Sequence, residues 1–279
     1  MSHAIEQEKV HEVVRGRYGK IAREGVPLPE AGPCGPRPEA IARRLGYASE
    51  EIATVPDGAN LGLGCGAPLR FLSLEPGETV LDLGSGAGFD AFLAAREVGE
   101  RGRVIGVDMT PEMVERARRN ASSAGFLHTE FRLGRIEALP IESASVDAVT
   151  SNCVINLVPD KASVYREIAR VLRPGGRMVV SDVVLLATLP PLVAESAAVF
   201  TGCVGGAALR SDALAAIEDA GLVGIEIVKE TGFGESFEEF VPVELREQAL
   251  AAGIDLAAVV RSVRSITVRA RKPAVRRAS

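Results

Sequence analysis

The stretch from Val80 to Gly88 reads Val-Leu-Asp-Leu-Gly-Ser-Gly-Ala-Gly. An apolar run ends in a glycine-rich turn, and a helical pattern begins directly afterwards at Phe89. Glycines in such a turn let the backbone approach a bound nucleoside closely, and the N-terminus of the following helix offers unpaired N–H groups. The stretch therefore predicts a strand–turn–helix unit that binds a nucleoside-containing cofactor.

The spacing of the glycines separates two classes of cofactor. A dinucleotide-binding turn has the pattern G-x-G-x-x-G. This chain has Gly84, Gly86 and Gly88 instead, with Phe89 where the last glycine of that pattern would stand. The carboxylate of Asp82 would repel a pyrophosphate but tolerate a positively charged sulfonium. The pattern favours S-adenosylmethionine and disfavours a nicotinamide-linked oxidoreductase.

Apolar runs and helical patterns alternate on the C-terminal side of this turn. Asp108 ends a second strand, where its carboxylate is suited to accept hydrogen bonds from ribose hydroxyls. Thr110 is expected to cap the next helix, with Pro111 at the first helical position. Repeated alternation of this kind predicts a mainly parallel sheet with helices on both faces. The strands are expected at 79–83, 104–108, 129–133, 146–151 and 177–184, and the main helices at 89–98, 111–124 and 161–172.

Three segments are expected around this core. Residues 1–70 form an N-terminal helical and loop segment, and residues 71–185 form the cofactor-binding core. Residues 186–279 form a C-terminal α+β extension, in which 265–271 is expected to be an edge or return strand because apolar and polar residues alternate there.

Composition excludes several classes of protein. The chain has 279 residues, 47% of them hydrophobic, and a formal net charge of −5, which argues against nucleic acid as the main partner. The longest apolar run, 178–200, is interrupted by Asp182, two prolines and Glu195, so no membrane span is expected. Residues 5–24 are too densely charged for a secretory signal. We expect a cytoplasmic protein.

The cysteines indicate the class of acceptor. Cys153 follows the fourth strand, and ligands of open α/β sheets bind outside the carboxyl ends of the strands. Cys65 and Cys203 stand among glycines, which leave room for a ligand to approach. Thiolates prefer soft centres. Trivalent arsenic bound by three thiolates keeps a lone pair that attacks a sulfonium methyl group without a general base, and the sequence offers no obvious base.

Five stretches of the chain closely resemble the arsenite methyltransferase family, and the strand–turn–helix motif resembles the class I methyltransferase fold. The similarity covers about residues 18–228, and its most specific part is the motifs that carry cysteines. The stretches are 60–66, 81–90, 106–113, 151–157 and 201–204. The resemblance implies a methyltransferase that moves the methyl group of S-adenosylmethionine to trivalent arsenic, for arsenic detoxification.

The resemblance also implies roles for individual residues around the cofactor. Gly84, Gly86 and Gly88 would line the methionine moiety, and Asp108 would bind the ribose. Met109 and the separate segment Ile136-Glu137 would flank the adenine. The full set of expected cofactor-binding residues is Asp82, Gly84, Ser85, Gly86, Gly88, Asp108, Met109, Ile136, Glu137 and Asn152.

The family resemblance implies that Cys65, Cys153 and Cys203 bind arsenic, with Cys153 and Cys203 as the minimal site for methylated arsenic. Cys34 would pair with Cys65 in a disulfide that reduces pentavalent intermediates, and thioredoxin or glutathione would restore the thiols. The family often has two cysteines near its first position, whereas Cys34 stands alone, and Ala67 replaces a common asparagine.

Three alternatives stay open. The chain could be a methyltransferase for a hydroxyl, carbon or thiol of a small organic acceptor, or a non-catalytic protein that binds a metalloid through thiols. Each cysteine could also simply pack in the interior, because cysteine is among the most buried residue types.

Overall fold

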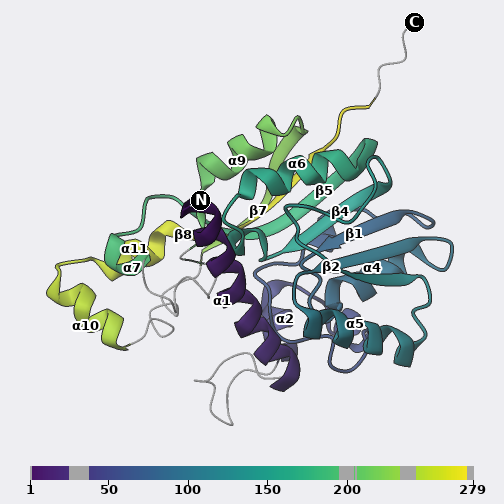
Figure 1. The fold of residues 1–279 in the computed structure, drawn as a ribbon, viewed down its shortest axis with the longest axis horizontal. Helices are drawn as coiled ribbons and strands as arrows, with labels where there is room; N and C mark the ends of the chain where they lie inside the picture. The colour runs from purple at the N-terminus through teal and green to yellow at the C-terminus, as the bar shows by residue number, and fades with distance from the viewer. Residues whose placement is uncertain (1, 25–37, 195–203, 205, 233–242, 275–279) are drawn as a thin grey trace, which may run out of the picture.

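The computed structural model describes residues 2–24, 38–194, 204, 206–232 and 243–274. One sheet forms the centre of the molecule, with helices around it (Figure 1). Its strands are β1 (Thr79–Leu83), β2 (Arg103–Asp108), β3 (Thr129–Leu133), β4 (Val146–Asn152), β5 (Leu172–Leu185), β6 (Ala208–Leu209), β7 (Val223–Gly232) and β8 (Val263–Arg271).

The strand order is β3-β2-β1-β4-β5-β8-β7, and β6 pairs with β5. Strands β1 to β5 pair in parallel, whereas β8 runs antiparallel between β5 and β7. This arrangement confirms the predicted α/β class. The prediction left open whether 265–271 forms an edge or a return strand, and the structure shows a return strand inside the sheet.

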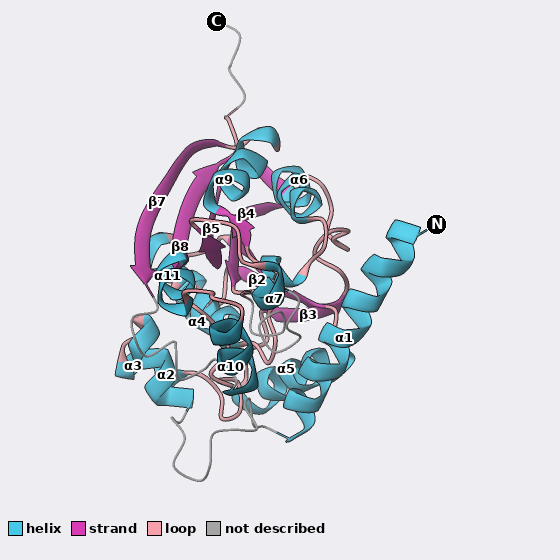
Figure 2. Cartoon of the chain, turned by 90° about the vertical axis from the view of Figure 1, so that its left-hand side faces the viewer, coloured by secondary structure: helices cyan, strands magenta, loops and turns pink. Residues whose placement is uncertain are grey.

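The helices cover both faces of this sheet. Figure 2 shows α6 and α9 on one side and α4 and α5 on the other. The helices are α1 (Ser2–Glu24), α2 (Pro38–Leu45), α3 (Ser49–Thr54), α4 (Phe89–Val98), α5 (Pro111–Ala124), α6 (Lys161–Val171), α7 (Pro191–Ala194), α9 (Arg210–Asp219), α10 (Val243–Ala251) and α11 (Leu256–Ser262), with 3-10 turns η1 (Pro68–Phe71) and η2 (Ile155–Leu157). Within the described ranges, no helix is long and apolar enough to cross a membrane.

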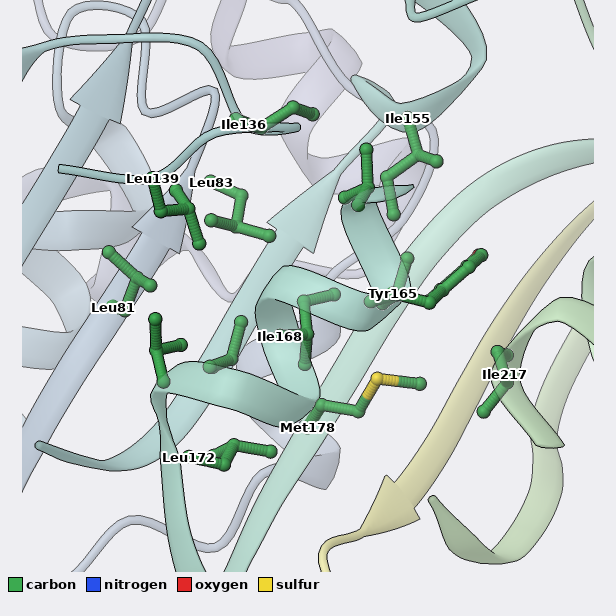
Figure 3. Close-up of a cluster of buried hydrophobic side chains, with 14 of the residues drawn as sticks. Leu81, Leu83, Ile136, Leu139, Ile155, Tyr165, Ile168, Leu172, Met178 and Ile217 are labelled. Carbon is green, nitrogen blue, oxygen red and sulfur yellow. The ribbon is translucent and has the colours of Figure 1, made fainter. Parts of the chain in front are cut away.

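Each face of the sheet buries its own hydrophobic cluster. On one face, Leu81 and Leu83 of β1 pack with Ile168 of α6 and Ile217 of α9 (Figure 3). On the other face, Phe92 of α4 is completely buried among side chains of α5 and the sheet. Strands buried on both faces are the reason why the sequence shows continuous apolar runs there.

Helix α1 packs against α5 (Figure 1) and lies outside the pairs of helices that cover the two faces of the sheet. Its buried residues Ile21 and Ala22 contact a small cluster that includes Leu61 and Met113. Helix α1 thereby connects the N-terminal segment to the loop that precedes Cys65 and to the helix that follows Asp108.

Candidate functional site

A cavity of about 260 Å³ lies at the carboxyl ends of β1, β2 and β4. Asp82, Asp108 and Asn152 reach its wall from these three strands, and α1 contributes Val14 and Tyr18 from the opposite side. Ligands of open α/β folds bind at this edge of the sheet. The cavity is therefore the first candidate for the predicted cofactor site.

Asp108 is held by the backbone around the glycine turn. Its two carboxylate oxygens accept hydrogen bonds from Gly86 N at 2.9 Å and from Thr110 N at 2.8 Å. Burial raises the pKa of Asp108, although these two hydrogen bonds oppose the rise. A carboxylate oxygen has two lone pairs, so each oxygen still has capacity to accept from a ligand hydroxyl.

Asp82 brings a further buried carboxyl group to the cavity, beside Asp108. It is 3% exposed, and its Oδ2 has no hydrogen-bond partner among the described residues. Burial raises the pKa of Asp82 well above its usual range, and the nearby charges of Asp90 and Asp108 raise it further. A cationic ligand would relieve this repulsion, whereas a pyrophosphate would increase it. These carboxyl groups fit the positively charged sulfonium and ammonium groups of S-adenosylmethionine.

The glycine turn meets the cavity at some positions and not at others. Gly84, Ser85 and Gly86 line the cavity, as do Met109 and the pair Ile136-Glu137. Gly88 is not among the lining residues and instead precedes α4 as its N-cap. The structure therefore brings every predicted cofactor-binding residue except Gly88 to one cavity.

Helix α1 closes the cavity on the side of Glu137. His11 is 4% exposed, and its Nε2 lies 2.6 Å from a carboxylate oxygen of Glu137. Arg135, two residues before Glu137, contacts Glu8 of the same helix. These contacts hold the segment expected to flank the adenine, and the sequence had given no role to α1.

Asn152 connects the cavity to the loop that carries Cys65. Its Oδ1 accepts from the backbone N–H groups of Cys65 at 3.1 Å and Gly66 at 3.3 Å. Its Nδ2 lies 3.0 Å from both Tyr47 Oη and Asp90 Oδ2. Asn152 was predicted as a cofactor-binding residue. In the structure it lines the cofactor cavity and also holds the loop that carries Cys65.

The Cys65 loop lies directly on the end of the sheet. The Cys65 carbonyl oxygen accepts a hydrogen bond from Ser265 Oγ of β8 at 2.6 Å. A Cβ atom at Gly66 would lie 2.6 Å from Ser181 Oγ of β5, so only glycine fits this approach. The glycine neighbour of Cys65 therefore lets the loop reach the end of β4, where Cys153 begins the next turn.

Cys153 adopts a left-handed backbone conformation, with φ at +60°. This conformation costs about 1–2 kcal/mol for a residue with a Cβ atom, and such strain concentrates at functional sites. The backbone N–H of Cys153 donates to the Ser181 carbonyl oxygen at 2.8 Å, which helps to hold the strained turn. The side chain of Cys153 lines the cavity.

The structure brings Cys65 and Cys153 together. Their sulfur atoms and a carboxylate oxygen of Asp182 all lie within 4.8 Å of one another. Cys34 and Cys203 lie outside the described residues. Val204, the residue after Cys203, is 5% exposed and packs in the same hydrophobic cluster as Cys65.

Comparison with known proteins agrees with this geometry. A family model described as a methyltransferase domain matches residues 74–230. The chain belongs to the methyltransferase family. It is 50% identical to an arsenite methyltransferase of Halobacterium salinarum over 79% of this chain, and 36% identical to one of Aquipseudomonas alcaligenes over 73% of this chain.

A solved structure is similar as well. The arsenic(III) S-adenosylmethionine methyltransferase of Chlamydomonas reinhardtii matches with a TM-score of 0.62 and 33% identity, over 85% of this chain and 74% of that one. The predicted resemblance to arsenite methyltransferases is confirmed by these matches. Our methyltransferase chain spans 59% of the length of each of the two curated relatives above.

Sequence reasoning missed three residues of this site. Tyr47 donates to Asp90 Oδ1 at 2.5 Å, and both side chains adjoin Asn152. Asp90 ends the stretch 81–90 that carries part of the family resemblance, which was a usable signal, but Tyr47 carries none. Asp182 interrupts the apolar run 178–200, and this was interpreted only as evidence against a membrane span.

Proposed function

We propose that this methyltransferase moves the methyl group of S-adenosylmethionine to trivalent arsenic bound by cysteine thiolates. The observation that carries the proposal is the proximity of Cys65 and Cys153, whose sulfur atoms lie within 4.8 Å of each other at the edge of an acidic cavity. Two sulfur ligands beside a site for a cationic methyl donor suit a soft acceptor. The relatives named arsenite methyltransferases support the same assignment.

The residues of the cavity have separate tasks in this proposal. Asp108 accepts from the ribose hydroxyls, and the acidic group of Asp82 and Asp90 attracts the positively charged part of the cofactor. Met109 and Ile136 provide the apolar surface for the adenine, next to Glu137. S-adenosylmethionine supplies an electrophilic methyl group, and the protein aligns it with the thiolate-bound acceptor.

The transfer needs positioning more than proton chemistry. The arsenic lone pair forms the new arsenic–carbon bond, and the carbon–sulfur bond of the sulfonium breaks with its electron pair remaining on sulfur. No proton moves in this step, so no general base is required. Alignment of two bound reactants contributes up to about 7–11 kcal/mol in favourable cases.

Cys203 is the proposed third arsenic ligand, and Cys153 with Cys203 the proposed minimal site for methylated arsenic. Val204 supports this, because it is the next residue along the chain and belongs to the same hydrophobic cluster as Cys65 and Val183. Three thiolates leave trivalent arsenic with one lone pair, which is the group that reacts.

A reducing cycle completes the proposal. Arsenic becomes formally pentavalent when its lone pair forms a bond to carbon, and two electrons must return before a second methylation. Cys34 and Cys65 would supply these electrons by forming a disulfide, which thioredoxin or glutathione would reduce. A cytoplasmic location suits this cycle because the cytosol keeps thiols reduced. We propose that the segments 1–70, 71–185 and 186–279 are the functional divisions of the chain.

Conversion of arsenite is the decisive measurement. The purified protein is incubated with arsenite, S-adenosylmethionine and a thiol reductant, and the arsenic species are separated. We expect methylated arsenic from the wild type and none from Cys153→Ser. Calorimetry on Cys153→Ser should still detect cofactor binding, which shows that the variant is folded.

The alternatives give different results in the same assay. A methyltransferase for an organic acceptor binds S-adenosylmethionine but forms no methylated arsenic. A non-catalytic metalloid binder takes up arsenite without any affinity for the cofactor. Either result contradicts the proposal.

A further inference from the structure

The cluster that contains Cys65 and Cys153 has a third member of different chemistry. Asp182 of β5 is 7% exposed, and one of its carboxylate oxygens lies within 4.8 Å of both sulfur atoms. Trivalent arsenic bound by three thiolates makes no use of a carboxylate. The proposed methylation therefore leaves Asp182 without a chemical task.

Asp182 is held rigidly next to the thiols. Its Oδ2 accepts from Asn156 N at 3.1 Å, in the 3-10 turn after Cys153, and its Oδ1 accepts from Val183 N at 2.8 Å. Each carboxylate oxygen has a second lone pair. The carboxylate can therefore keep these backbone contacts and still bind a cation.

The electrostatic environment also favours a cation. Asp182 is buried, and the charge of Lys161 acts on its carboxylate. The Lys161 ammonium donates to the Val158 carbonyl oxygen at 3.0 Å. A buried carboxylate beside two potential thiolates concentrates negative charge, which a divalent cation would neutralise.

Two sulfur ligands and one oxygen ligand fit a small set of metal ions. Zn²⁺ binds cysteine sulfur at about 2.3 Å and aspartate oxygen at about 2.0–2.2 Å, in a tetrahedron whose ligand atoms are roughly 3.5–3.8 Å apart. The three atoms here lie within 4.8 Å of one another, so small side-chain rotations would close the site. Three protein ligands leave the fourth position open to water.

We propose that Cys65, Cys153 and Asp182 form a binding site for a thiophilic divalent cation of the zinc class. Cation binding itself is independent of the methylation proposed above. One consequence rests on that proposed function: zinc competes with trivalent arsenic, because both use the same two thiolates. The sequence alone did not indicate such a site, since the three residues are far apart along the chain.

X-ray absorption at the zinc edge tests the ligands directly. The full chain, reduced and loaded with one equivalent of Zn²⁺, is measured without S-adenosylmethionine or arsenite. We expect two sulfur ligands, with the remaining ligands oxygen. Three sulfur ligands would assign the third position to another cysteine and overturn the role of Asp182. This measurement needs no variant, so three sulfur ligands would overturn the proposal even if substitution of Asp182 prevents folding.

Calorimetric titration with Zn²⁺ tests the same site by substitution. Loss of a residue that merely supports a ligand weakens metal affinity about 10–100-fold, so Asp182→Asn should weaken zinc binding by more than about tenfold. The matched control is Asp212→Asn, because Asp212 lines the neighbouring cavity that Asp182 also lines. Unchanged zinc affinity in folded Asp182→Asn contradicts the proposal.

Arsenite titrations separate this proposal from the methylation. Zinc should raise the apparent dissociation constant for arsenite in the wild type. Asp182→Asn should weaken zinc binding at least about tenfold more than it weakens arsenite binding, because arsenic uses thiolates alone. Equal losses for both ligands would contradict a direct bond from Asp182 to zinc. A chain that binds zinc but methylates no arsenic would refute only the proposed function.

Discussion

Asn152 shows at the scale of one residue how the cofactor cavity and the thiol pair are connected. It directly precedes Cys153, and its side chain accepts from the backbone of Cys65 and Gly66. The same amide contacts Tyr47 and Asp90, and Asp90 also lines the cavity. The separation of the two sulfur atoms therefore depends on a side chain that neither binds arsenic nor carries a sulfur atom.

Substitution of Asn152 tests this connection. Asn152→Ala leaves buried N–H groups of the Cys65 loop without an acceptor, which costs roughly 1–3 kcal/mol of folding stability. We expect arsenite affinity, measured by calorimetry, to fall as the loop loosens. Asn120→Ala is the control, because Asn120 makes a buried contact to the Ala87 carbonyl oxygen away from the thiols. Arsenite affinity that is equal in the two variants would contradict the role of Asn152.

Gly86 gives a second prediction at this scale. It has a left-handed φ of +51°, and a Cβ atom there would meet only Met113 Sδ at 4.0 Å, in the open space of the cavity. Gly99 has a similar φ of +65° and no neighbour within 4 Å, but it lies outside the cavity. Alanine should reduce stability through backbone strain at both positions, by about 1–2 kcal/mol at Gly86 and by up to about 3 kcal/mol at Gly99, whose ψ of −179° lies in a region that essentially only glycine adopts.

Only one of these two variants should affect the cofactor. We expect Gly86→Ala to lose S-adenosylmethionine binding in a calorimetric titration, since its methyl group would occupy the cavity. Gly99→Ala should bind normally. Cofactor binding that survives in Gly86→Ala would show that the cofactor does not approach this part of the turn.

At the scale of elements, α1 determines whether the cavity is closed. Ile21 is 4% exposed and anchors α1 on the cluster around Met113, whereas Val13 of the same helix is 55% exposed. Val14 and Tyr18, on adjacent turns, line the cavity. Docking of α1 and binding of the cofactor should therefore depend on each other.

Ile21→Ala tests this dependence. Removal of a buried isoleucine side chain costs roughly 2–5 kcal/mol, here taken from the docking of α1. Backbone amides of α1 should exchange hydrogen faster, and cofactor affinity should fall although Ile21 is not among the residues that line the cavity. Val13→Ala should change neither quantity. Fast exchange without loss of affinity would show that α1 does not close the site.

At the scale of the whole molecule, the charge buried between the sheet and its helices makes stability depend on pH. Burial raises the pKa of Asp182 to about 6, while an aspartate in an unfolded chain titrates near ~3.9. Between these values the folded state keeps a proton that the unfolded state has released. The stability that this proton contributes is present below about pH 4 and is lost as the pH rises through about 6.

Asp182→Asn should remove this dependence. Relative to the wild type, the variant should gain stability as the pH rises from about 4 to about 8, by at most about 3 kcal/mol, because one pKa unit corresponds to ~1.4 kcal/mol. Urea unfolding at several pH values measures the difference. A stability difference that stays constant across this range would mean that Asp182 titrates alike in both states.

Local patterns predicted the elements of the cofactor half accurately. The expected strand 79–83, helix 89–98 and strand 129–133 coincide with β1, α4 and β3. The helix expected at 161–172 ends one residue earlier, at Val171. Periodicity, the proline after Thr110 and the glycine spacing act within one element, so a single sequence contains this information.

One sequence was enough to predict the α/β class, the glycine turn and the cysteines as the chemically distinctive residues. The folded chain was needed to show that β8 lies inside the sheet, that Asn152 holds the Cys65 loop, and that Asp182 adjoins both sulfur atoms. These three features depend on strand pairing and side-chain packing, which join residues far apart along the chain. Cys65 and Asp182 meet because β5 and the loop after α3 end at the same edge of the sheet, and no local pattern encodes that meeting.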